Sequence, residues 1–317
     1  MFTAPRGVLG LALLGLAVIL DSCHSPRGAT SETHATGDFI TLPGCTDVLL
    51  GTPLDAGNDE YHAEESPRRV DVSSFAVARC LISAEEFCAF LNSPHSEAAK
   101  IDVLWCDDAS RDAPFGTITR VDRHFVPRPG ADRAPANRVT WIGATEYCKW
   151  RSRIDAHFNY RLLTDNEWEY MARGRNGRLW PWGEQVPDAS RGYRWTRKTI
   201  ASGSTWITCA VGTFTAGATP EGVLDVLCFP LYEWCGDDTT EVQAWATVLP
   251  WRTEAPPEDH LQCARGHYMK ERERLGFLDA LLSNMWHESR TWSRFAVPGK
   301  RAACTAGCGF RVVRMPK

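Results

Sequence analysis

The sequence predicts an α+β fold with few helices, many loops and short strands. Short apolar or alternating runs, which are typical of strands, occupy much of residues 39–79. Three segments further along each begin with a Ser or Thr that can cap a helix. Long stretches, such as 102–135 and 201–220, show little apolar periodicity. We therefore expect a few short helices packed on small, irregular sheets.

The chain begins with the pattern of a signal peptide, which we assign to residues 1–22. An uncharged apolar run of 13 residues, 8–20, follows Arg6. A permanent transmembrane helix needs roughly 20 such residues, so that export is the favoured interpretation.

The end of this segment resembles a bacterial lipobox. Residues 20–23 read Leu-Asp-Ser-Cys, and in such a motif Cys23 becomes the lipidated first residue of the mature protein. A lipid would tether the chain to a membrane surface without spanning it, and secretion without lipid is the alternative. Because His24 rather than aspartate follows Cys23, the resemblance implies an outer-membrane lipoprotein of the bacterial cell envelope, and otherwise a periplasmic or secreted protein.

Residues 23–38 are predicted to form a flexible tether, because they are rich in Ser, Thr, Gly and Ala without apolar periodicity. The remaining residues, 39–317, are enough for one domain with a sizeable core. The net charge is −4, and no run of Lys and Arg is interleaved with aromatic residues. We therefore expect no nucleic-acid partner.

The first part of the domain predicts four strands and a helix. The strands cover residues 39–44, 48–51, 67–72 and 75–79. Ser83 then caps a helix, and Glu86 completes a capping box three residues later. Phe87, Phe90 and Leu91 are expected on the inner face of this helix.

Residues 102–135, rich in Asp, Arg and Pro, are predicted to be a surface excursion with one short strand at 124–126. Thr140 predicts the start of a second helix, which we expect to end near Ile154. The candidates for its inner face are Ala144, Tyr147, Cys148 and Trp150.

A third helix is predicted after the short apolar run 162–163. Thr164 is its expected N-cap and Glu167 completes the capping box, so that the helix begins at Asp165. Gly174 is expected to end it. The predicted inner face holds Trp168, Met171 and Ala172.

The whole stretch 161–183, RLLTDNEWEYMARGRNGRLWPWG, closely resembles the signature of the formylglycine-generating enzyme family, the sulfatase-modifying factors. The matching positions are Arg161, Leu162, Thr164, Glu167, Trp168, Glu169, Tyr170, Ala172, Arg173, Gly174, Pro181, Trp182 and Gly183. An ordinary amphipathic helix would explain the apolar spacing but not this ordered string. Further similar strings at 211–214, 222–237, 264–269 and 309–314 extend the resemblance over the domain, and the last of them resembles the family's final strand, so we expect one strand at 309–314. It implies an irregular fold related to C-type lectins.

The resemblance also implies where catalytic residues should lie. Enzymes of this family oxidise a substrate cysteine to formylglycine with copper(I) held by two cysteines, and soft thiolates are the ligands that select Cu(I). Ungapped counting from Gly266 places the two positions at Lys270 and Leu275, neither of which supplies a thiolate. Residues 270–286 instead predict an amphipathic helix with an apolar stripe of Leu275, Leu278, Leu282 and Trp286.

Twelve cysteines in an exported chain predict disulfides, and eleven remain if Cys23 carries a lipid. Cys304 and Cys308 are the closest pair in the sequence. Structural disulfides are the favoured interpretation of this pair, and a displaced copper or redox site is the alternative. The sequence contains no CxxC pair, so that we expect no structural zinc.

Calcium is a second metal that the resemblance implies. Asp225, Asp237 and Asp238 are the candidate ligands, but residues 228–230 replace a Gly-Asn pair of the family and remove an amide oxygen. Because calcium takes six to eight oxygens, we favour a solvated acidic loop, with calcium as the alternative. Arg265 is expected at the surface, the usual place of arginine.

Two functional hypotheses follow. The first is an anchored, exported binding or assembly module, with a protein or glycan partner, that has lost the oxidase cysteines. The alternative is a formylglycine-generating oxidase that uses Cys304 and Cys308 and binds copper. We favour the first because Lys270 and Leu275 stand at the catalytic positions.

Overall fold

The computed structural model describes residues 38–51, 67–98, 104–105, 116–185, 188–191, 209–227, 231–238, 261–266, 294–298 and 308–317. The predicted signal peptide lies outside these ranges, as does the predicted tether apart from Asp38. No helix within the ranges is long and apolar enough to cross a membrane.

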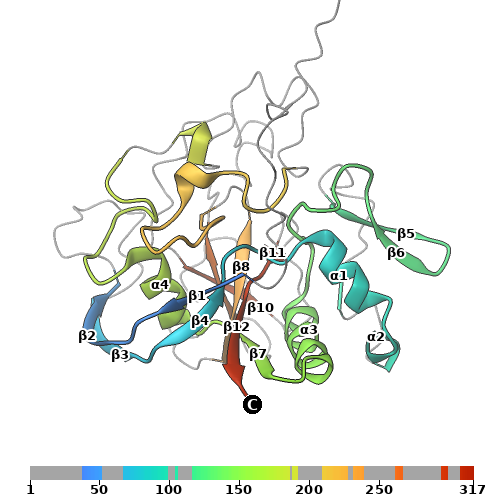
Figure 1. Ribbon diagram of the computed structural model, residues 1–317, viewed down its shortest axis with the longest axis horizontal. Helices are drawn as coiled ribbons and strands as arrows, with labels where there is room; N and C mark the ends of the chain where they lie inside the picture. The colour runs from blue at the N-terminus through green and yellow to red at the C-terminus, as the bar shows by residue number, and fades with distance from the viewer. Residues whose placement is uncertain are drawn as a thin grey trace, which may run out of the picture. The chain divides into compact units, whose positions relative to one another are not determined.

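A four-stranded antiparallel sheet contains the first and the last strands that the structure describes (Figure 1). Its order is β1 (Phe39–Leu42), β4 (Phe75–Ala78), β12 (Val312–Pro316) and β7 (Phe158–Leu162). Val313 of β12 lies opposite Val77 on one side and Arg161 on the other. The C-terminal strand β12 is thus inserted between β4 and β7, which come from much earlier in the chain, so this sheet joins distant parts of the domain.

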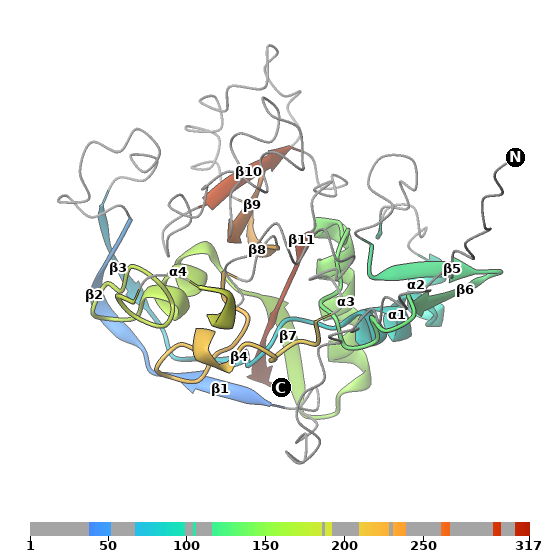
Figure 2. The same ribbon diagram turned by 90° about the horizontal axis from the view of Figure 1, so that it is seen from above.

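A second four-stranded sheet and two hairpins complete the β-structure. The second sheet has the order β10 (Arg294–Pro298), β9 (Leu261–Gly266), β8 (Tyr232–Asp238) and β11 (Cys308–Gly309). Figure 2 shows β8, β9 and β10 side by side, away from β1 and β4. The hairpins are β2 (Cys45–Leu50) with β3 (Arg68–Val72), and β5 (Ile118–Val121) with β6 (His124–Pro127). These small, scattered sheets confirm the predicted α+β class.

The helices are α1 (Ala84–Leu91), α2 (Pro94–Ala98), α3 (Trp141–Ile154) and α4 (Asp165–Arg173), with single 3-10 turns η3 (Ala189–Arg191) and η5 (Thr215–Gly217). The three predicted N-caps are confirmed. Ser83 and Thr164 both form capping boxes, and the Thr140 hydroxyl accepts the backbone N–H of Gly143. Gly174 ends α4 with φ +67°, a backbone conformation that glycine adopts without strain.

Helices α1, α3 and α4 pack on the sheets through two apolar clusters. One cluster holds α1 and α3, where the ring of Phe310 lies 5.8 Å from Phe87 and 5.2 Å from Tyr147 between ring centroids. The other holds α4 and the β2–β3 hairpin, and it completely buries Trp168 and Leu50. Several aromatic side chains belong to the first cluster, and each such side chain removes a large apolar area from water.

Three expectations from the sequence were wrong or incomplete. The segment 309–314 is not one strand, because it divides between β11 and β12 in different sheets. Phe310 and Arg311 lie between these strands and are fully buried, so their side-chain contacts override the extended pairing. Strand β5 and helix α2 were not predicted. Helix α4 is buried on all sides rather than on one face, and its buried residues include charged ones.

Candidate functional site

Helix α4 directs two carboxylates into the protein. Asp165 and Glu169 are four residues apart, so that both lie on the same side of the helix. Glu169 is fully buried and Asp165 nearly so. Buried carboxylates are stable as charges only with hydrogen-bonded cationic partners, and three arginines supply them.

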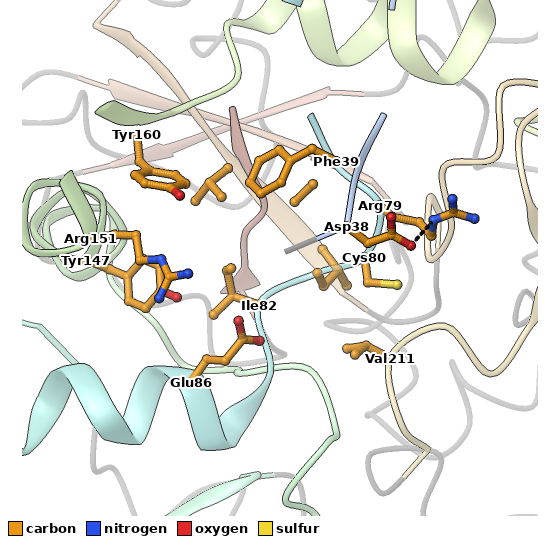
Figure 3. Close-up of a pocket in the computed structure, with 13 residues that line it drawn as sticks. Asp38, Phe39, Arg79, Cys80, Ile82, Glu86, Tyr147, Arg151, Tyr160 and Val211 are labelled. Carbon is orange, nitrogen blue, oxygen red and sulfur yellow. Dashed lines mark ion pairs between the residues drawn. The ribbon is translucent and has the colours of Figure 1, made fainter. Parts of the chain in front are cut away.

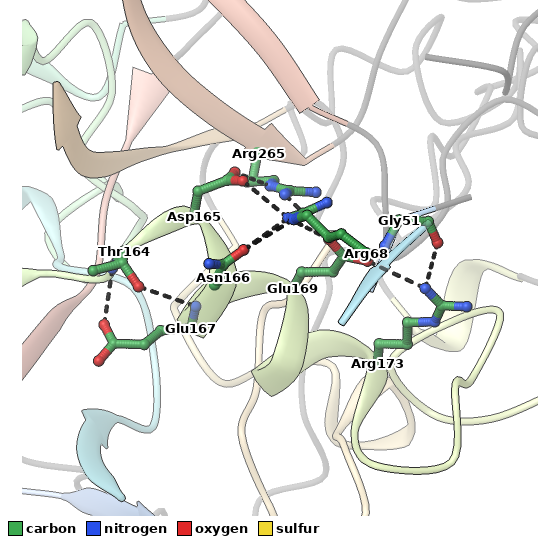
Figure 4. Close-up of polar contacts among 9 residues, drawn as sticks. All are labelled: Gly51, Arg68, Thr164, Asp165, Asn166, Glu167, Glu169, Arg173 and Arg265. Carbon is green, nitrogen blue, oxygen red and sulfur yellow. Dashed lines mark hydrogen bonds and ion pairs between the residues drawn. The ribbon is translucent and has the colours of Figure 1, made fainter. Parts of the chain in front are cut away.

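The three arginines come from different elements, and we call Arg68, Asp165, Glu169, Arg173 and Arg265 the arginine–carboxylate cluster (Figure 4). Arg265 of β9 approaches Asp165 at 2.5 Å and Glu169 at 3.2 Å. Arg68 of β3 lies 3.4 Å from Asp165 and 3.3 Å from Glu169. Arg173 pairs with Glu169 at 3.2 Å. With three guanidinium groups and two carboxylates, the cluster carries one net positive charge.

Gly51 extends the cluster to the end of β2. Its backbone N–H donates to Glu169 at 2.6 Å, and its carbonyl accepts from Arg173. The Arg265 guanidinium also lies over the Trp168 ring, 5.9 Å from its centroid. The expectation that Arg265 lies at the surface was wrong, because its side chain is fully buried against helix α4, where Asp165 and Glu169 bind it. The cluster therefore ties β2, β3, β9 and α4 together.

Strand β9 ends at Gly266, directly before the segment where the resemblance places the oxidase cysteines. Arg265 fixes the chain five residues before Lys270. Lys270 and Leu275 themselves lie outside the described residues, as does the predicted helix 270–286. Neither an ammonium nor an alkyl side chain is a copper(I) ligand, so these two residues do not fit the metal that the resemblance implies.

One of the candidate calcium ligands, Asp225, does not lie in a solvated loop. Asp225 is buried, and both of its carboxylate oxygens accept the Gly212 N–H, at 2.9 and 3.0 Å. Burial raises the pKa of this carboxyl, although the Gly212 hydrogen bond and Arg311 oppose the shift. Asp237 and Asp238 end β8, but their side chains lie outside the described part of the chain. Among the described residues, no group of three or more His, Cys, Asp or Glu side chains could hold a metal.

Arg311 forms a second buried ion pair beside Asp225. It bonds both carboxylate oxygens of Glu233, at 2.5 and 3.0 Å, and its Nη1 donates to the Leu224 carbonyl at 3.1 Å. Charge from Glu233 raises the pKa of Arg311 despite its burial. The pair joins β8 to the link between β11 and β12, which explains why that link is not extended strand.

The cysteines of the alternative oxidase site are only half described. Cys308 lies on β11 and is fully buried, whereas Cys304 and the lipidation candidate Cys23 lie outside the described residues. Cys45, Cys80, Cys88 and Cys148 carry free thiols, so they do not form the disulfides that the cysteine count predicted. Burial raises the pKa of Cys80 and of Cys88 to about 12, which keeps both thiols protonated at neutral pH.

Sequence reasoning missed most of the arginine–carboxylate cluster. It placed the apolar residues of α4 inside but gave Asp165, Glu169 and Arg173 no partners. One local signal was present: these three charged residues recur at four-residue spacing and so share one side of the helix. The spacing does not reveal that Arg68 and Arg265, from distant parts of the chain, complete the set.

The fold and this buried cluster define an α+β domain in which charged residues of one capped helix hold together small, separate sheets. The family described as sulfatase-modifying factor enzyme 1-like domain matches residues 29–316. The chain belongs to this family, which confirms the resemblance found in the sequence.

Curated relatives include both active and inactive members. The chain is 42% identical over 168 residues to inactive C-alpha-formylglycine-generating enzyme 2 of Mus musculus, covering 46% of this chain and 51% of the relative. It is 26% identical over 199 residues to the Bos taurus protein of the same name, covering 56% and 62%. It is 37% identical over 187 residues to the formylglycine-generating enzyme of Streptomyces coelicolor, covering 52% and 56%. The chain thus spans about half to three fifths of these relatives.

Two solved structures show the same fold. PvdO from Pseudomonas aeruginosa superposes with a TM-score of 0.52 at 23% identity, covering 87% of this chain and 93% of PvdO. CarF superposes with a TM-score of 0.51 at 14% identity, covering 88% and 98%. At these identities the similarity concerns the fold alone.

Proposed function

We propose that this chain is a binding or assembly module of the sulfatase-modifying factor family that does not oxidise cysteine. The observation that carries the proposal is the pair Lys270 and Leu275 at the positions where the resemblance places copper cysteines. Without two thiolates at these positions, copper(I) has no site there.

Two further observations support the proposal. The relatives named above include proteins called inactive, so this fold exists without the oxidase activity. In addition, the described residues that lead into this segment are held by ion pairs within the protein. The arginine–carboxylate cluster ties the Arg265 strand to helix α4 through side chains of the protein itself.

The proposed setting is the bacterial cell envelope, with the chain anchored through lipidated Cys23 and a flexible tether to residue 38. A protein or glycan partner would bind on the exported domain. Labelled palmitate should be incorporated into the full chain and not into the Cys23→Ala variant, and the wild-type chain should fractionate with the outer membrane. Equal labelling of the two chains would contradict the lipid anchor.

The oxidase question is tested by copper(I) titration of the purified chain against a competing chromophoric chelator. We expect no competitive copper binding and no oxygen-dependent oxidation of a cysteine peptide. The variant Cys304→Ala/Cys308→Ala should behave like the wild type. The matched control is Cys88→Ala/Cys148→Ala, which removes two buried thiols from the α1 and α3 region.

Tight copper binding together with peptide oxidation, both lost in Cys304→Ala/Cys308→Ala but kept in Cys88→Ala/Cys148→Ala, would overturn the proposal. It would establish the alternative, a formylglycine-generating oxidase with its cysteine pair in a displaced position.

A further inference from the structure

A small cavity lies between helices α1 and α3 and the sheet formed by β1, β4, β12 and β7 (Figure 3). Its volume is about 40 Å³, which is room for about three water molecules. The polar groups on its wall come from Asp38, Arg79, Cys80, Glu86, Tyr147, Arg151 and Tyr160. Phe39, Ile82, Val211 and Val312 supply apolar surface. None of these residues belongs to the segment 267–286, where the resemblance places the oxidase cysteines, so the cavity is separate from that candidate copper site.

Glu86 presents an unused carboxylate oxygen to this cavity. Its Oε2 accepts the backbone N–H of Ser83 at 2.9 Å and the Ser83 hydroxyl at 2.7 Å, which completes the α1 capping box. Within the part of the chain that the structure describes, Oε1 accepts no hydrogen bond. Burial raises the pKa of Glu86, while Ser83, Arg151 and Arg133 oppose the shift. One oxygen therefore has a structural role and the other remains available for a ligand.

Tyr147 contributes the hydroxyl of an otherwise buried side chain. Its side chain is 2% exposed, and among the described residues its hydroxyl has no hydrogen-bond partner. Burial, and next the charge of Glu86, raise the pKa of Tyr147 well above its ordinary value. The hydroxyl oxygen is not one of the fully buried polar atoms that lack a partner, so it is open to the cavity and can bond what occupies it. A ligand or water in the cavity would supply the missing partner.

Arg151 supplies the opposite charge. Its guanidinium lies over the Tyr160 ring, 5.6 Å from the centroid, and forms no ion pair with a carboxylate of the described residues. Arg79 is different, because Asp38 binds it at 2.8 Å. Figure 3 shows Tyr147 and Arg151 together on the α3 side, with Glu86 reaching in from α1. The cavity thus has a cationic donor and an anionic acceptor that are not paired with each other.

We propose that this cavity binds the zwitterionic group of a small α-amino acid of the size of glycine. The ammonium group would donate to Glu86, the carboxylate would accept from Arg151, and the Tyr147 hydroxyl would bond the carboxylate. The apolar wall formed by Phe39, Ile82 and Val312 offers no partner to a polar side chain. The volume of about 40 Å³ also excludes large side chains.

Glycine is the probe, titrated by calorimetry into the purified full chain. Acetate and methylammonium, which each carry only one of the two charges, serve as ligand controls and should bind at least tenfold more weakly. Glu86→Gln keeps an amide oxygen for the Ser83 cap while removing the charge, so it should lose glycine binding and stay folded. The matched control is Glu85→Gln, which changes the exposed neighbouring residue and should bind like the wild type.

Tyr147→Phe separates binding from folding. Because the hydroxyl has no partner in the described structure, its removal should leave the melting temperature unchanged or higher. It should nevertheless weaken glycine binding by about tenfold, the equivalent of one hydrogen bond. A structural hydroxyl would give the opposite pair of results, a lower melting temperature with unchanged binding.

Two results would overturn the proposal. One is the absence of heat from glycine at concentrations up to about 10 mM, which would mean that the cavity holds ordered water only. The other is binding that Glu86→Gln and Tyr147→Phe leave unchanged. Both outcomes are independent of copper binding, so they neither support nor contradict the proposed loss of oxidase activity.

Discussion

Replacing Arg265 by Met tests the arginine–carboxylate cluster most directly. The side chain is fully buried and bonds Asp165 at 2.5 Å and Glu169 at 3.2 Å. Methionine fills similar space without the charge. Glu169 would keep Arg68, Arg173 and the Gly51 N–H, and Asp165 would keep Arg68, 3.4 Å away. Because Arg265 lies nearer to Asp165 than Arg68 does, the cost should arise mainly at Asp165, and removal of one partner from a buried pair costs about 3–5 kcal/mol.

Urea denaturation followed by tryptophan fluorescence measures the effect as a change in the free energy of unfolding. Arg69→Met is the matched control, because Arg69 pairs with Asp47 at 2.8 Å but both side chains are more than half exposed. An exposed pair contributes about 0–1 kcal/mol, so the control should change little. The variants differ in burial and not in the kind of interaction removed.

A second substitution identifies the source of the cost. In Arg265→Met/Asp165→Asn, an uncharged amide replaces the carboxylate that lost its partner. The double variant should therefore be more stable than the sum of the two single losses predicts. A coupling of about 0.5–3 kcal/mol is expected for residues in contact. If Arg265→Met costs no more than Arg69→Met, or if the two losses simply add, the cluster does not stabilise this domain as described.

Three further predictions concern local structure. Thr164→Ala removes the acceptor for the Glu167 N–H and should lower the free energy of unfolding by about 1 kcal/mol in the same urea assay. Thr164→Ser keeps a hydroxyl acceptor and should therefore keep most of the wild-type stability. Gly143→Ala places a Cβ against the backbone carbonyl of Leu104 and should cost about 1–3 kcal/mol, and a neutral result would contradict that close approach. The Tyr160 hydroxyl, with backbone N–H groups, lowers the pKa of Asp155 to about 2. Because the pKa is lower in the folded than in the unfolded state, the charged Asp155 carboxyl stabilises the fold at pH values above the unfolded-state pKa, and this stabilisation is lost as the pH falls towards 2. In an acid titration, Asp155→Asn should therefore lose less stability than the wild type between the unfolded-state pKa and pH 2.

The starts of the helices were predictable because capping is a local interaction. Ser83 and Thr164 each bond a residue three positions later, so the residues that define the helix start lie within one turn. The family could be recognised from the ordered string 161–183 for a similar reason, because the string is one continuous segment of the sequence. The prediction of a single strand at 309–314 failed because Arg311 bonds Glu233, 78 residues away in the sequence.

The sequence by itself determined the α+β class, the three capped helices, the family and the lack of cysteines at 270 and 275. The tertiary structure decided which charges meet. Arg265 and Asp165 are 100 residues apart, and nothing in the local sequence of either residue specifies the other. The same holds for the cavity, where Glu86 was predictable as a cap and Tyr147 as a core residue. Only the packing of α1 against α3 places them around a common space, because long-range contacts depend on the three-dimensional path of the whole chain.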